Sequence, residues 1–258
     1  KTPALITGAS SGIGVELARI HARRGGDLVL VARRQDRLEA LRAELESAHG
    51  VKVYVIVQDL TRADAAAQIH RELIARGVPI DYLINNAGFG TSGEFHELDP
   101  DRLDAEVQLN VAALTRLSRA ALGVMVPRGR GYLLNVSSVV SFQPAPKLAV
   151  YAATKAYVTS LSESLHEEVR GTGVHVTALC PGLTRTEFQS VSSTESYATQ
   201  YPKFAWLEPD EVAKAGLDDV AKGKALSVPG VLYKGMAAAA GVTPRGLTRR
   251  LSSLVQRG

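Results

Sequence analysis

Tyr151 and Lys155 stand four residues apart in residues 149–158, a segment whose composition predicts a helix. Four residues are about one helical turn, so the phenol and the ammonium group share one face. A positive charge beside a phenol favours the phenolate and lowers the phenol pKa from its ordinary value of about 10. Tyr151 could then exchange a proton with a carbonyl or alcohol oxygen. Two unrelated helix-surface residues are the alternative, which other motifs must exclude.

A glycine-rich turn near the start of the chain joins an apolar, strand-like segment at residues 4–6 to a helix-like segment at residues 15–20. Glycines permit a sharp turn and let a phosphate approach the helix N-terminus, whose free N–H groups and dipole favour an anion. Glycines at this spacing also occur in ordinary loops, but the preceding strand and the following helix favour nucleotide binding. The candidate phosphate-binding residues are Gly8, Ser10, Ser11, Gly12, Ile13 and Gly14.

With these motifs, the chain resembles the short-chain dehydrogenase/reductase family, in the branch with the TGxxxGxG and YxxxK motifs. The resemblance extends from about Thr2 to about Val228. Extended relatives that epimerise or dehydrate sugars have another glycine spacing and longer chains. Further matching motifs follow in order at Asp59 and Leu60, residues 85–88, Asn110 and Val111, residues 135–138, and Pro181 and Gly182.

The apolar segments alternate with helical stretches, which predicts an α/β fold. Their nearly unbroken, β-branched character is typical of parallel strands covered on both faces. We expect a single domain with a Rossmann-type doubly wound parallel sheet flanked by helices and with ligands beyond the carboxyl ends of the strands. Residues 1–228 would form the catalytic part, with a substrate lid at about 187–208, and residues 229–258 a C-terminal extension of the same domain. The expected strands are residues 4–6, 28–31, 51–57, 82–85, 132–136, 174–179 and 225–228.

Composition narrows the class of protein. The 258 residues are 45% hydrophobic without an evident membrane-spanning run, which predicts a soluble protein. The lone Cys180 cannot form an internal disulfide, so we expect a reducing, cytoplasmic location and a buried, inert thiol. The first residue is Lys1, which leaves a removed targeting segment open. The six histidines show no metal-ligand spacing, so we expect no metal. The net charge of +4 weakly favours anionic ligands, and no nucleic-acid module is present.

Arg33 and Arg34 follow the second predicted strand, where an NAD enzyme would place Asp or Glu to hold the ribose hydroxyls. Either arginine could pair with a 2′-phosphate, and we expect no acidic residue to be positioned there to repel it. A solvated basic helix start is the alternative. A cation at a helix N-terminus is unfavourable unless an anion compensates it, so we predict NADP (NADPH) over NAD as the cofactor.

The resemblance implies further cofactor contacts. Asp59 and Leu60 would lie on the adenine side, and Asn86, Ala87 and Gly88 would flank the ribose, although Asn86 could instead tie backbone groups together. The segment covering the nicotinamide and the phosphates would comprise Pro181, Gly182, Leu183, Thr184 and Thr186.

The resemblance also implies a catalytic tetrad of Asn110, Ser138, Tyr151 and Lys155. Ser138 and Tyr151 would hydrogen-bond the substrate oxygen, Lys155 would bind the nicotinamide ribose and lower the Tyr151 pKa, and Asn110 would hold a water linking Lys155 to solvent. Side chains alternate along a strand, so only one of Ser137 and Ser138 can readily face the site, and the family motif selects Ser138. We expect an oxidoreductase that interconverts a carbonyl and an alcohol with Tyr151 as general acid or base. A dinucleotide-binding sensor or scaffold with incidental activity is the alternative.

Aromatic residues near the expected lid predict a bulky apolar carbonyl or alcohol as substrate. They could instead pack against the protein body or a second subunit. These residues are Phe188, Tyr197, Tyr201, Phe204 and Trp206, with Phe89, Phe95 and Phe142 after other strands.

Assembly is predicted from two segments. Small residues in the Tyr151 helix permit close approach of a second copy, as relatives in this family commonly pair, so we expect a homodimer; packing on the protein's own sheet is the alternative. Residues 244–257 predict a basic amphipathic helix. We expect it to dock on the protein body; covering the substrate pocket, joining a partner subunit and lying on an acidic membrane surface are the alternatives. The small residues are Ala152, Ala153, Ala156, Thr159 and Ser160, and the helix has Leu247, Leu251, Leu254 and Val255 opposite Arg249, Arg250 and Arg257.

Overall fold

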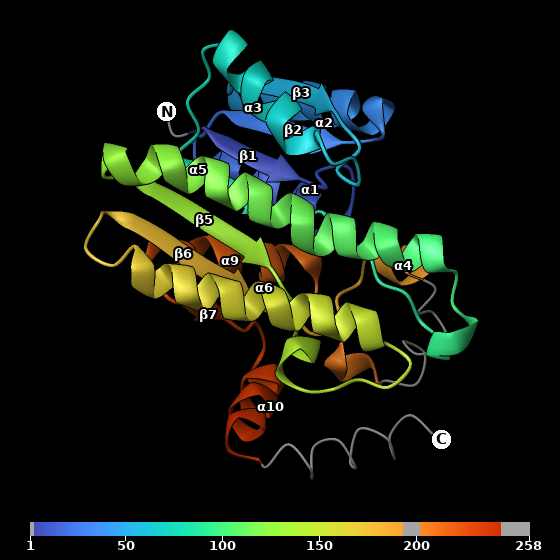
Figure 1. The fold of residues 1–258 in the computed structure, drawn as a ribbon. Coiled ribbons are helices and arrows are strands. Elements are labelled where there is room, and N and C mark those ends of the chain that lie inside the picture. The colour runs from blue at the N-terminus through green and yellow to red at the C-terminus, as the bar shows by residue number, and fades with distance from the viewer. Residues whose placement is uncertain (1–2, 193–201, 244–258) are drawn as a thin grey trace.

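The computed structural model describes residues 3–192 and 202–243. Within them, one seven-stranded sheet runs in the order β3-β2-β1-β4-β5-β6-β7, with every adjacent pair parallel (Figure 1). The predicted Rossmann-type doubly wound sheet in a single domain is thereby confirmed. The strands are β1 (Ala4–Thr7), β2 (Leu28–Ala32), β3 (Val53–Val57), β4 (Tyr82–Asn85), β5 (Gly131–Val136), β6 (Val174–Leu179) and β7 (Leu226–Ser227).

Helices cover both faces of the sheet, and the strand sequences explain why. In β2 all five residues are buried, as expected for a strand with apolar layers on each side. Ile6 and Leu30 belong to the core on one face, whereas Leu5 and Val29 belong to the core on the other. The first face is covered by α1 (Gly12–Arg23), α2 (Gln35–His49) and α9 (Pro209–Ala221), and the second by α3 (Ala65–Ala75), α5 (Leu114–Arg128) and α6 (Ala149–Glu168).

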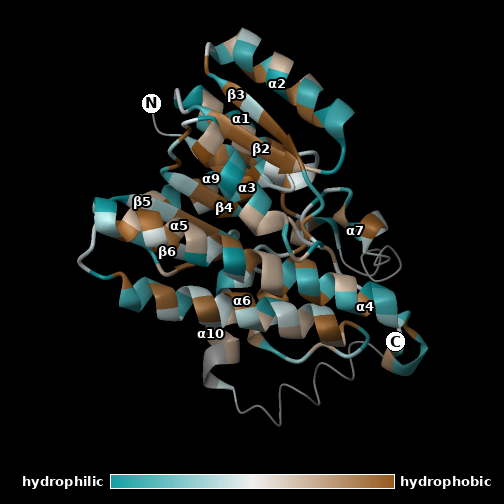
Figure 2. Ribbon diagram, turned by 45° about the horizontal axis from the view of Figure 1, so that its top comes forward, coloured by the Kyte–Doolittle hydropathy of each residue, from teal (hydrophilic) through white to brown (hydrophobic). Residues whose placement is uncertain are grey.

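Local signals set several helix ends. The Asp99 side chain accepts a hydrogen bond from the Asp101 N–H, and Pro100 follows at the first helical position, so α4 (Pro100–Val107) begins there. Gly50 ends α2 in the left-handed conformation, with φ 60°. Figure 2 shows α2 with mixed hydrophilic and hydrophobic positions, typical of a helix with one buried face, and Leu38, Leu41 and Leu45 are the buried ones.

One continuous helical run crosses the front of the molecule in Figure 1, from Pro100 to Arg128. It includes a π-helical segment, η2 (Gln108–Ala113), between α4 and α5. By length and composition alone the run could span a membrane, contrary to the sequence expectation, but Leu117, Ala121 and Met125 on its inner face are buried in the core under the sheet. It is therefore a core helix of this fold.

The remaining elements surround the carboxyl ends of the strands. Most predicted strands match within two residues, and the last is shorter than expected. After β7 the chain forms α10, which the sequence did not predict. Predictions for Tyr197, Tyr201 and the helix at residues 244–257 lie outside the described residues. These remaining elements are η1 (Phe95–Glu97), η3 (Val139–Phe142), α7 (Phe188–Val191), η4 (Lys203–Ala205) and α10 (Val231–Val242).

Candidate active site

A cavity of about 570 Å³ lies at the carboxyl ends of the strands, the place predicted for ligands in a doubly wound sheet. One end is formed by the glycine turn and by the loop after β2. The other end is formed by Ser138, Tyr151 and Lys155. Most of the predicted cofactor residues line this cavity, so the sequence motifs converge on one site. Those lining it are Gly8, Ser10, Ser11, Gly12, Ile13, Arg33, Arg34, Leu60, Asn86, Ala87, Gly88, Pro181, Gly182, Leu183, Thr184 and Thr186.

The glycine turn has the shape of a phosphate cradle. A Cβ atom on Gly14 would lie 2.3 Å from the Gly8 carbonyl oxygen, so only glycine lets the turn fold this tightly. Gly12 has φ +55°, a conformation that other residues rarely adopt. Ser11 precedes α1, and its side chain makes no capping hydrogen bond to the helix. The start of α1 therefore offers N–H groups and a free hydroxyl to an anion, which fits a dinucleotide phosphate.

Asn86 ties the ends of two neighbouring strands together. Its side-chain amide donates to the carbonyl oxygens of Thr7, at 3.0 Å, and Gly8, at 3.2 Å. In return, the Thr7 hydroxyl accepts from the N–H groups of Asn86 and Ala87, each at 3.0 Å. The alternative interpretation of Asn86, a tie between backbone groups, therefore describes its side chain in this structure.

Asp59 is held by the loop that follows β3. Burial opposes its ionisation, but hydrogen bonds from the Thr61 N–H and hydroxyl, with the nearby charges of Arg33 and Arg62, lower its carboxyl pKa overall. The Thr61 hydroxyl donates at 2.8 Å. Among the described residues, Gln58, Leu60 and Thr61 line the cavity here, whereas the Asp59 carboxylate is engaged by Thr61. Gln58 and Thr61 are cavity residues that the motifs did not identify.

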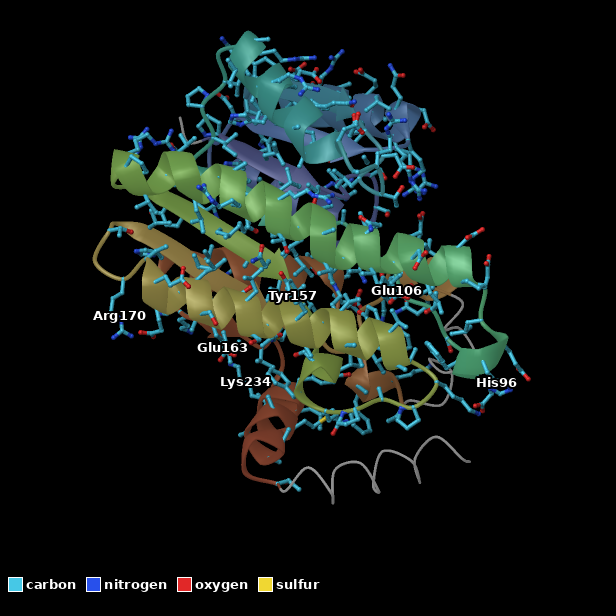
Figure 3. All side chains as sticks on the ribbon, in the orientation of Figure 1. His96, Glu106, Tyr157, Glu163, Arg170 and Lys234 are labelled. Carbon is cyan, nitrogen blue, oxygen red and sulfur yellow. The ribbon has the colours of Figure 1, made fainter. Side chains whose placement is uncertain are left out.

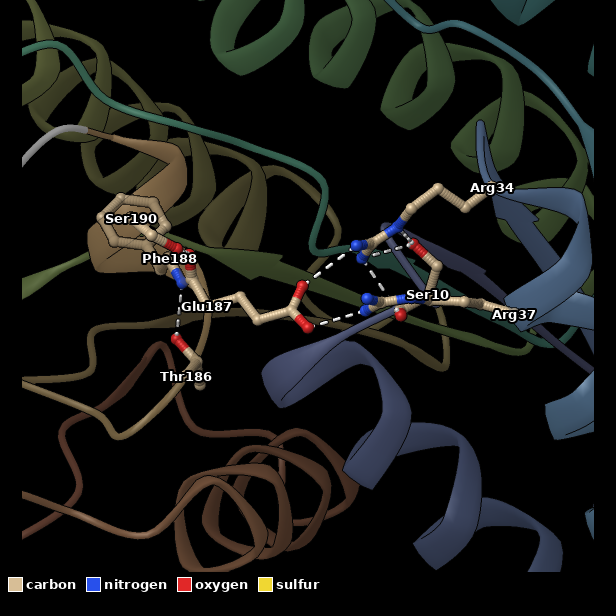
Figure 4. Close-up of polar contacts among 7 residues, drawn as sticks. All are labelled: Ser10, Arg34, Arg37, Thr186, Glu187, Phe188 and Ser190. Carbon is tan, nitrogen blue, oxygen red and sulfur yellow. Dashed lines mark hydrogen bonds and ion pairs between the residues drawn. The ribbon is translucent and has the colours of Figure 1, made fainter.

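An acidic residue stands beside the predicted 2′-phosphate site, and this corrects the sequence expectation. Glu187 accepts from Arg34 at 3.0 Å and from Arg37 at 2.7 Å (Figure 4). Hydrogen bonds from Arg37 and Arg34 lower the pKa of the Glu187 carboxyl. Arg34 also donates to the Ser10 hydroxyl, at 3.2 Å from Nε. Glu187 was missed because it lies far from Arg34 in sequence and reaches it only through the fold.

Tyr151 and Ser138 face each other at the other end of the cavity. The hydrogen bond with Ser138 lowers the Tyr151 pKa, but burial dominates and raises it, and the charge of Glu106 raises it further. The direction is opposite to the expected lowering by Lys155. The geometry explains this result: Lys155 Nζ lies 5.7 Å from the centre of the Tyr151 ring, over its face. Tyr151 in this structure is therefore a protonated phenol.

Ser137, which follows β5 and also lines the cavity, has its hydroxyl engaged by α6. Its hydroxyl donates to the Lys155 carbonyl oxygen at 2.8 Å and lies 2.7 Å from the Thr159 hydroxyl. Ser137 thus fastens β5 to α6, and Ser138 is the serine available to a substrate oxygen.

Lys155 is only 5% exposed, and its Nζ donates to the Val136 carbonyl oxygen at 2.8 Å. Burial lowers its pKa to about 8, while Cys180 and Glu106 act in the opposite direction only in their ionised forms. A Cβ atom on Gly88 would lie 3.0 Å from Asn110 Oδ1 and 3.5 Å from Lys155 Nζ, so Gly88 lies beside both side chains.

Asn110 lies in the π-helical segment η2, with its side chain buried beneath the cavity. Its amide donates to the Phe89 carbonyl oxygen at 2.8 Å and to the Thr154 hydroxyl at 3.1 Å, and its oxygen accepts from the Phe89 N–H at 3.2 Å. These bonds brace the loop after β4 against α6. The predicted water link from Asn110 to Lys155 stays a prediction. The Asn110 side-chain oxygen accepts one hydrogen bond here and can accept a second one, from a water molecule.

Tyr233 of α10 supports the segment predicted to cover the nicotinamide. Its hydroxyl accepts from the Leu183 N–H at 3.1 Å and donates to the Ala205 carbonyl oxygen at 2.7 Å. Its ring lies against Gly182, where a Cβ atom would be 2.0 Å away. The sequence motifs missed Tyr233, because it lies in the predicted C-terminal extension, after the last family motif.

The predicted aromatic lining is partly wrong. Phe89 and Phe188 line the cavity, and the Phe188 ring lies 5.5 Å from the Tyr151 ring. Phe95 and Phe204 are instead 61% and 79% exposed. Trp206 stacks with Arg185. Phe142 and Trp206 are absent from the described cavity lining, which includes Leu148, Leu232, Tyr233 and Met236.

Cys180 lies behind the site at the end of β6, fully buried. Its sulfur is 3.8 Å from the Thr159 hydroxyl, and burial raises the pKa of the thiol to about 11. The thiol is therefore protonated and shielded, as expected for a packing residue.

The fold and the cavity define a dinucleotide-binding oxidoreductase in which a tyrosine, a serine and a lysine meet beside the cofactor cleft. Residues 2–196 match the family model for short chain dehydrogenase. The chain belongs to the short-chain dehydrogenase/reductase family. It is an oxidoreductase of the kind that acts on alcohol and carbonyl groups.

Individual relatives support this assignment. An uncharacterized oxidoreductase of Myxococcus xanthus is 38% identical over 190 residues, which are 74% of this chain and 75% of that protein. An NADP-dependent 3-hydroxy acid dehydrogenase of Salmonella typhi is 33% identical over 82% of this chain and 86% of its own length.

Solved structures agree in fold over nearly the whole chain. A short-chain dehydrogenase from Sphingobium yanoikuyae in complex with NADPH has a TM-score of 0.85 and 37% identity, covering 98% of this chain and 95% of that one. The bulky-bulky ketone specific alcohol dehydrogenase from Comamonas testosteroni has a TM-score of 0.78 and 32% identity, covering 95% and 96% of the two chains.

Proposed function

We propose that this protein is an NADPH-dependent carbonyl reductase, or the reverse alcohol dehydrogenase, acting on a bulky apolar substrate. The observation that carries the proposal is the meeting of Ser138, Tyr151 and Lys155 at one end of a cavity whose other end has Arg33 and Arg34. The glycine cradle and the free start of α1 fit the phosphates between these two ends.

The chain's residues divide the chemistry between them. A bound nicotinamide supplies the hydride in reduction or accepts it in oxidation. Ser138 and Tyr151 donate hydrogen bonds to the substrate oxygen, where negative charge develops. Tyr151 then gives its proton to that oxygen, which completes the alcohol. A protonated Tyr151 can serve as the acid in the reductive direction, and its phenolate would serve as the base in the oxidative direction.

Lys155 and Asn110 hold this arrangement in place. The Lys155 amine lies close to Gly88 in the cavity lining, where it would donate to the cofactor ribose. Asn110 braces the Phe89 loop against Thr154 of α6, one residue before Lys155. Tyr233 holds Leu183 so that the covering loop closes over the cofactor side.

The cavity wall supports a bulky apolar substrate. Beyond Tyr151 the wall is formed by apolar side chains, which bury apolar surface and leave orientation to a few polar groups. The relative from Comamonas testosteroni, described as bulky-bulky ketone specific, favours the same substrate class. The lining residues on this side include Val140, Leu148, Phe188, Val191, Leu232 and Met236.

A turnover screen of the purified protein across aldehydes and ketones of increasing bulk, with NADPH and with NADH, tests the proposal. We expect oxidation of NADPH, fastest with bulky apolar ketones. Binding of NADPH without turnover on any carbonyl would instead support a dinucleotide-binding sensor or scaffold.

Cofactor preference has its own test. Arg33→Ala should weaken NADPH by about 1.5 to 3 kcal/mol, the range for a charge-assisted hydrogen bond, and leave NADH almost unchanged. Dissociation constants for both cofactors measure this. An equal loss of affinity for NADPH and NADH would show that Arg33 does not bind the 2′-phosphate. A preference of the parent protein for NADH would overturn the NADP proposal.

We also propose a homodimer that pairs through α6, in a cytoplasmic location. Ala153, Ala156 and Ser160 are exposed on that helix, whereas Ala152 and Thr159 are buried against the protein's own body. Light scattering tests the dimer, and a monomeric mass would refute it. Cell fractionation tests the location, which the single free cysteine supports.

A further inference from the structure

Glu106 is a buried carboxylate that the proposed mechanism does not use. It lies in the last turn of α4 and is 0% exposed. Its Oε2 accepts from the Thr91 hydroxyl at 2.6 Å. Its Oε1 is buried and has no hydrogen-bond partner among the described residues. Figure 3 shows Glu106 on the side of α4 that faces α6.

The position of Glu106 relates it to the catalytic residues. It precedes Asn110 by four residues in a continuous helical run, so the two lie on the same side of the helix. The charged groups that act on it are Lys155 from α6 and Arg102 from its own helix, and Glu106 in turn acts on Tyr151 of α6. Thr91, from the loop after β4, is its hydrogen-bond donor.

The electrostatics around Glu106 are reciprocal. Burial raises its pKa to about 7, while the hydrogen bond from Thr91 and the charges of Lys155 and Arg102 act in the opposite direction. In return, ionised Glu106 raises the pKa of Lys155 and that of Tyr151. Once ionised, Glu106 therefore favours a charged Lys155 and a protonated Tyr151.

A purely structural role would not require an acid. The Thr91 hydroxyl needs one acceptor, which a glutamine carbonyl oxygen supplies equally well. An ionisable group with one oxygen unpaired in a dry site is costly for stability. The acid is therefore better explained by its effect on its neighbours than by packing.

We propose that Glu106 is a positioning residue, whose buried negative charge, one helical turn before Asn110, keeps the amine of Lys155 protonated. The proposal gains its catalytic meaning from the proposed function, but the charge of Lys155 can be measured without turnover. A protonated amine donates three hydrogen bonds, enough for the Val136 carbonyl oxygen and the ribose hydroxyls together. A neutral amine would offer fewer donors and no positive charge beside Tyr151.

The direct test is NMR of the protein with isotope-labelled lysine side chains, with the Lys155 signal assigned by its loss in Lys155→Arg. Glu106→Gln keeps the shape and the acceptor for Thr91 but removes the charge. We expect Lys155 to lose its proton roughly 0.5 to 1 pH unit lower in this variant than in the parent. The matched control is Asp104→Asn, which removes an exposed charge from the same helix and should leave the Lys155 titration unchanged.

A second pair of variants decides the question if Glu106→Gln does not fold. Thr91→Val removes the hydrogen bond that favours ionised Glu106, so it should shift the Lys155 titration in the same direction by a smaller amount. Thr91→Ser keeps the hydroxyl and should restore the parental titration. A Lys155 titration unchanged in Glu106→Gln, or the same in Thr91→Val and Thr91→Ser, overturns the proposal.

Turnover provides a separate readout. If the protein reduces carbonyls, the alkaline fall of kcat should move to lower pH in Glu106→Gln and stay in place in Asp104→Asn. A parent that reduces no carbonyl would refute the proposed function, while the NMR titration would still decide the role of Glu106.

Discussion

Tyr151 experiences two opposing effects at the scale of the single residue. Burial raises the pKa of its phenol and the hydrogen bond with Ser138 lowers it, with burial the larger effect. A phenol that keeps its proton can donate it to the carbonyl oxygen while the carbonyl is being reduced.

Tyr151→Phe should reduce turnover by about 10²-fold or more, because the ring still packs beside Phe188 but the proton donor is gone. NADPH binding should persist, which fluorescence titration of the cofactor can check. The matched control is Tyr157→Phe on the same helix, whose hydroxyl contacts Thr115 away from the cavity. Activity near the parental level in Tyr151→Phe would exclude Tyr151 as the general acid.

Glu187 competes for the arginines that are proposed to read the 2′-phosphate. Its carboxylate bridges Arg34 and Arg37, and all three side chains are 39% to 45% exposed. Exposed ion pairs contribute only about 0 to 1 kcal/mol, so the competition is modest.

Glu187→Gln should therefore bind NADPH about two- to fivefold more tightly and NADH with unchanged affinity. Dissociation constants at low and high salt measure the effect, which should shrink as salt rises. Glu208→Gln breaks the Arg185 pair instead and serves as the control. Weaker NADPH binding in Glu187→Gln would show that the carboxylate organises the arginines rather than competing for them.

At the scale of elements, α10 supports the cofactor side of the cavity through Tyr233. The Tyr233 hydroxyl satisfies the Leu183 N–H and the Ala205 carbonyl oxygen together. One side chain thus connects the loop after β6 to η4 and to the C-terminal helix.

Tyr233→Phe should leave both backbone groups without this partner and cost about 1 to 3 kcal/mol of stability. We expect a higher KM for the cofactor with a smaller change in kcat, since the covering loop loosens while Tyr151 stays in place. Chemical denaturation and steady-state kinetics measure the two effects. An unchanged cofactor KM would mean that the loop is held without Tyr233.

Local patterns in the sequence predicted the strands and the glycine turn well, because both depend on neighbouring residues. The run at residues 28–31 is apolar throughout, and β2 is buried throughout. The contacts of Glu187 with Arg34 and of Tyr233 with Leu183 join residues far apart in the chain, so no local pattern contains them. The burial of Glu106 likewise cannot be predicted from the sequence. Asp104 is an acidic residue on the same helix, two positions earlier, and it is exposed.

At the scale of the whole molecule, buried and paired carboxyl groups act on stability in opposite directions as pH changes. Glu187 and Glu44 have lowered pKa values through their arginine partners, so their contribution is lost as pH falls. Glu106 has a raised pKa in the folded state, so its contribution is present at low pH and is lost as pH rises through about 7.

The difference in unfolding free energy between the parent and Glu106→Gln should therefore depend on pH. The parent should lose stability relative to the variant between about pH 4.5 and 7, by at most about 1.4 kcal/mol per pH unit. Chemical denaturation at a series of pH values measures the difference. A constant difference across this window would show that Glu106 does not titrate there.

The strand order has a consequence for how the chain is made. β1 is synthesised before the other strands, yet it lies inside the sheet with β2 on one edge and β4 on the other. A nascent chain ending after β3 can pair three strands but leaves the second edge of β1 open, and an open apolar edge invites pairing with another molecule. The glycine cradle emerges early, whereas Ser138 and Tyr151 follow only after β5. N-terminal fragments of this protein should therefore aggregate rather than persist as small nucleotide-binding units.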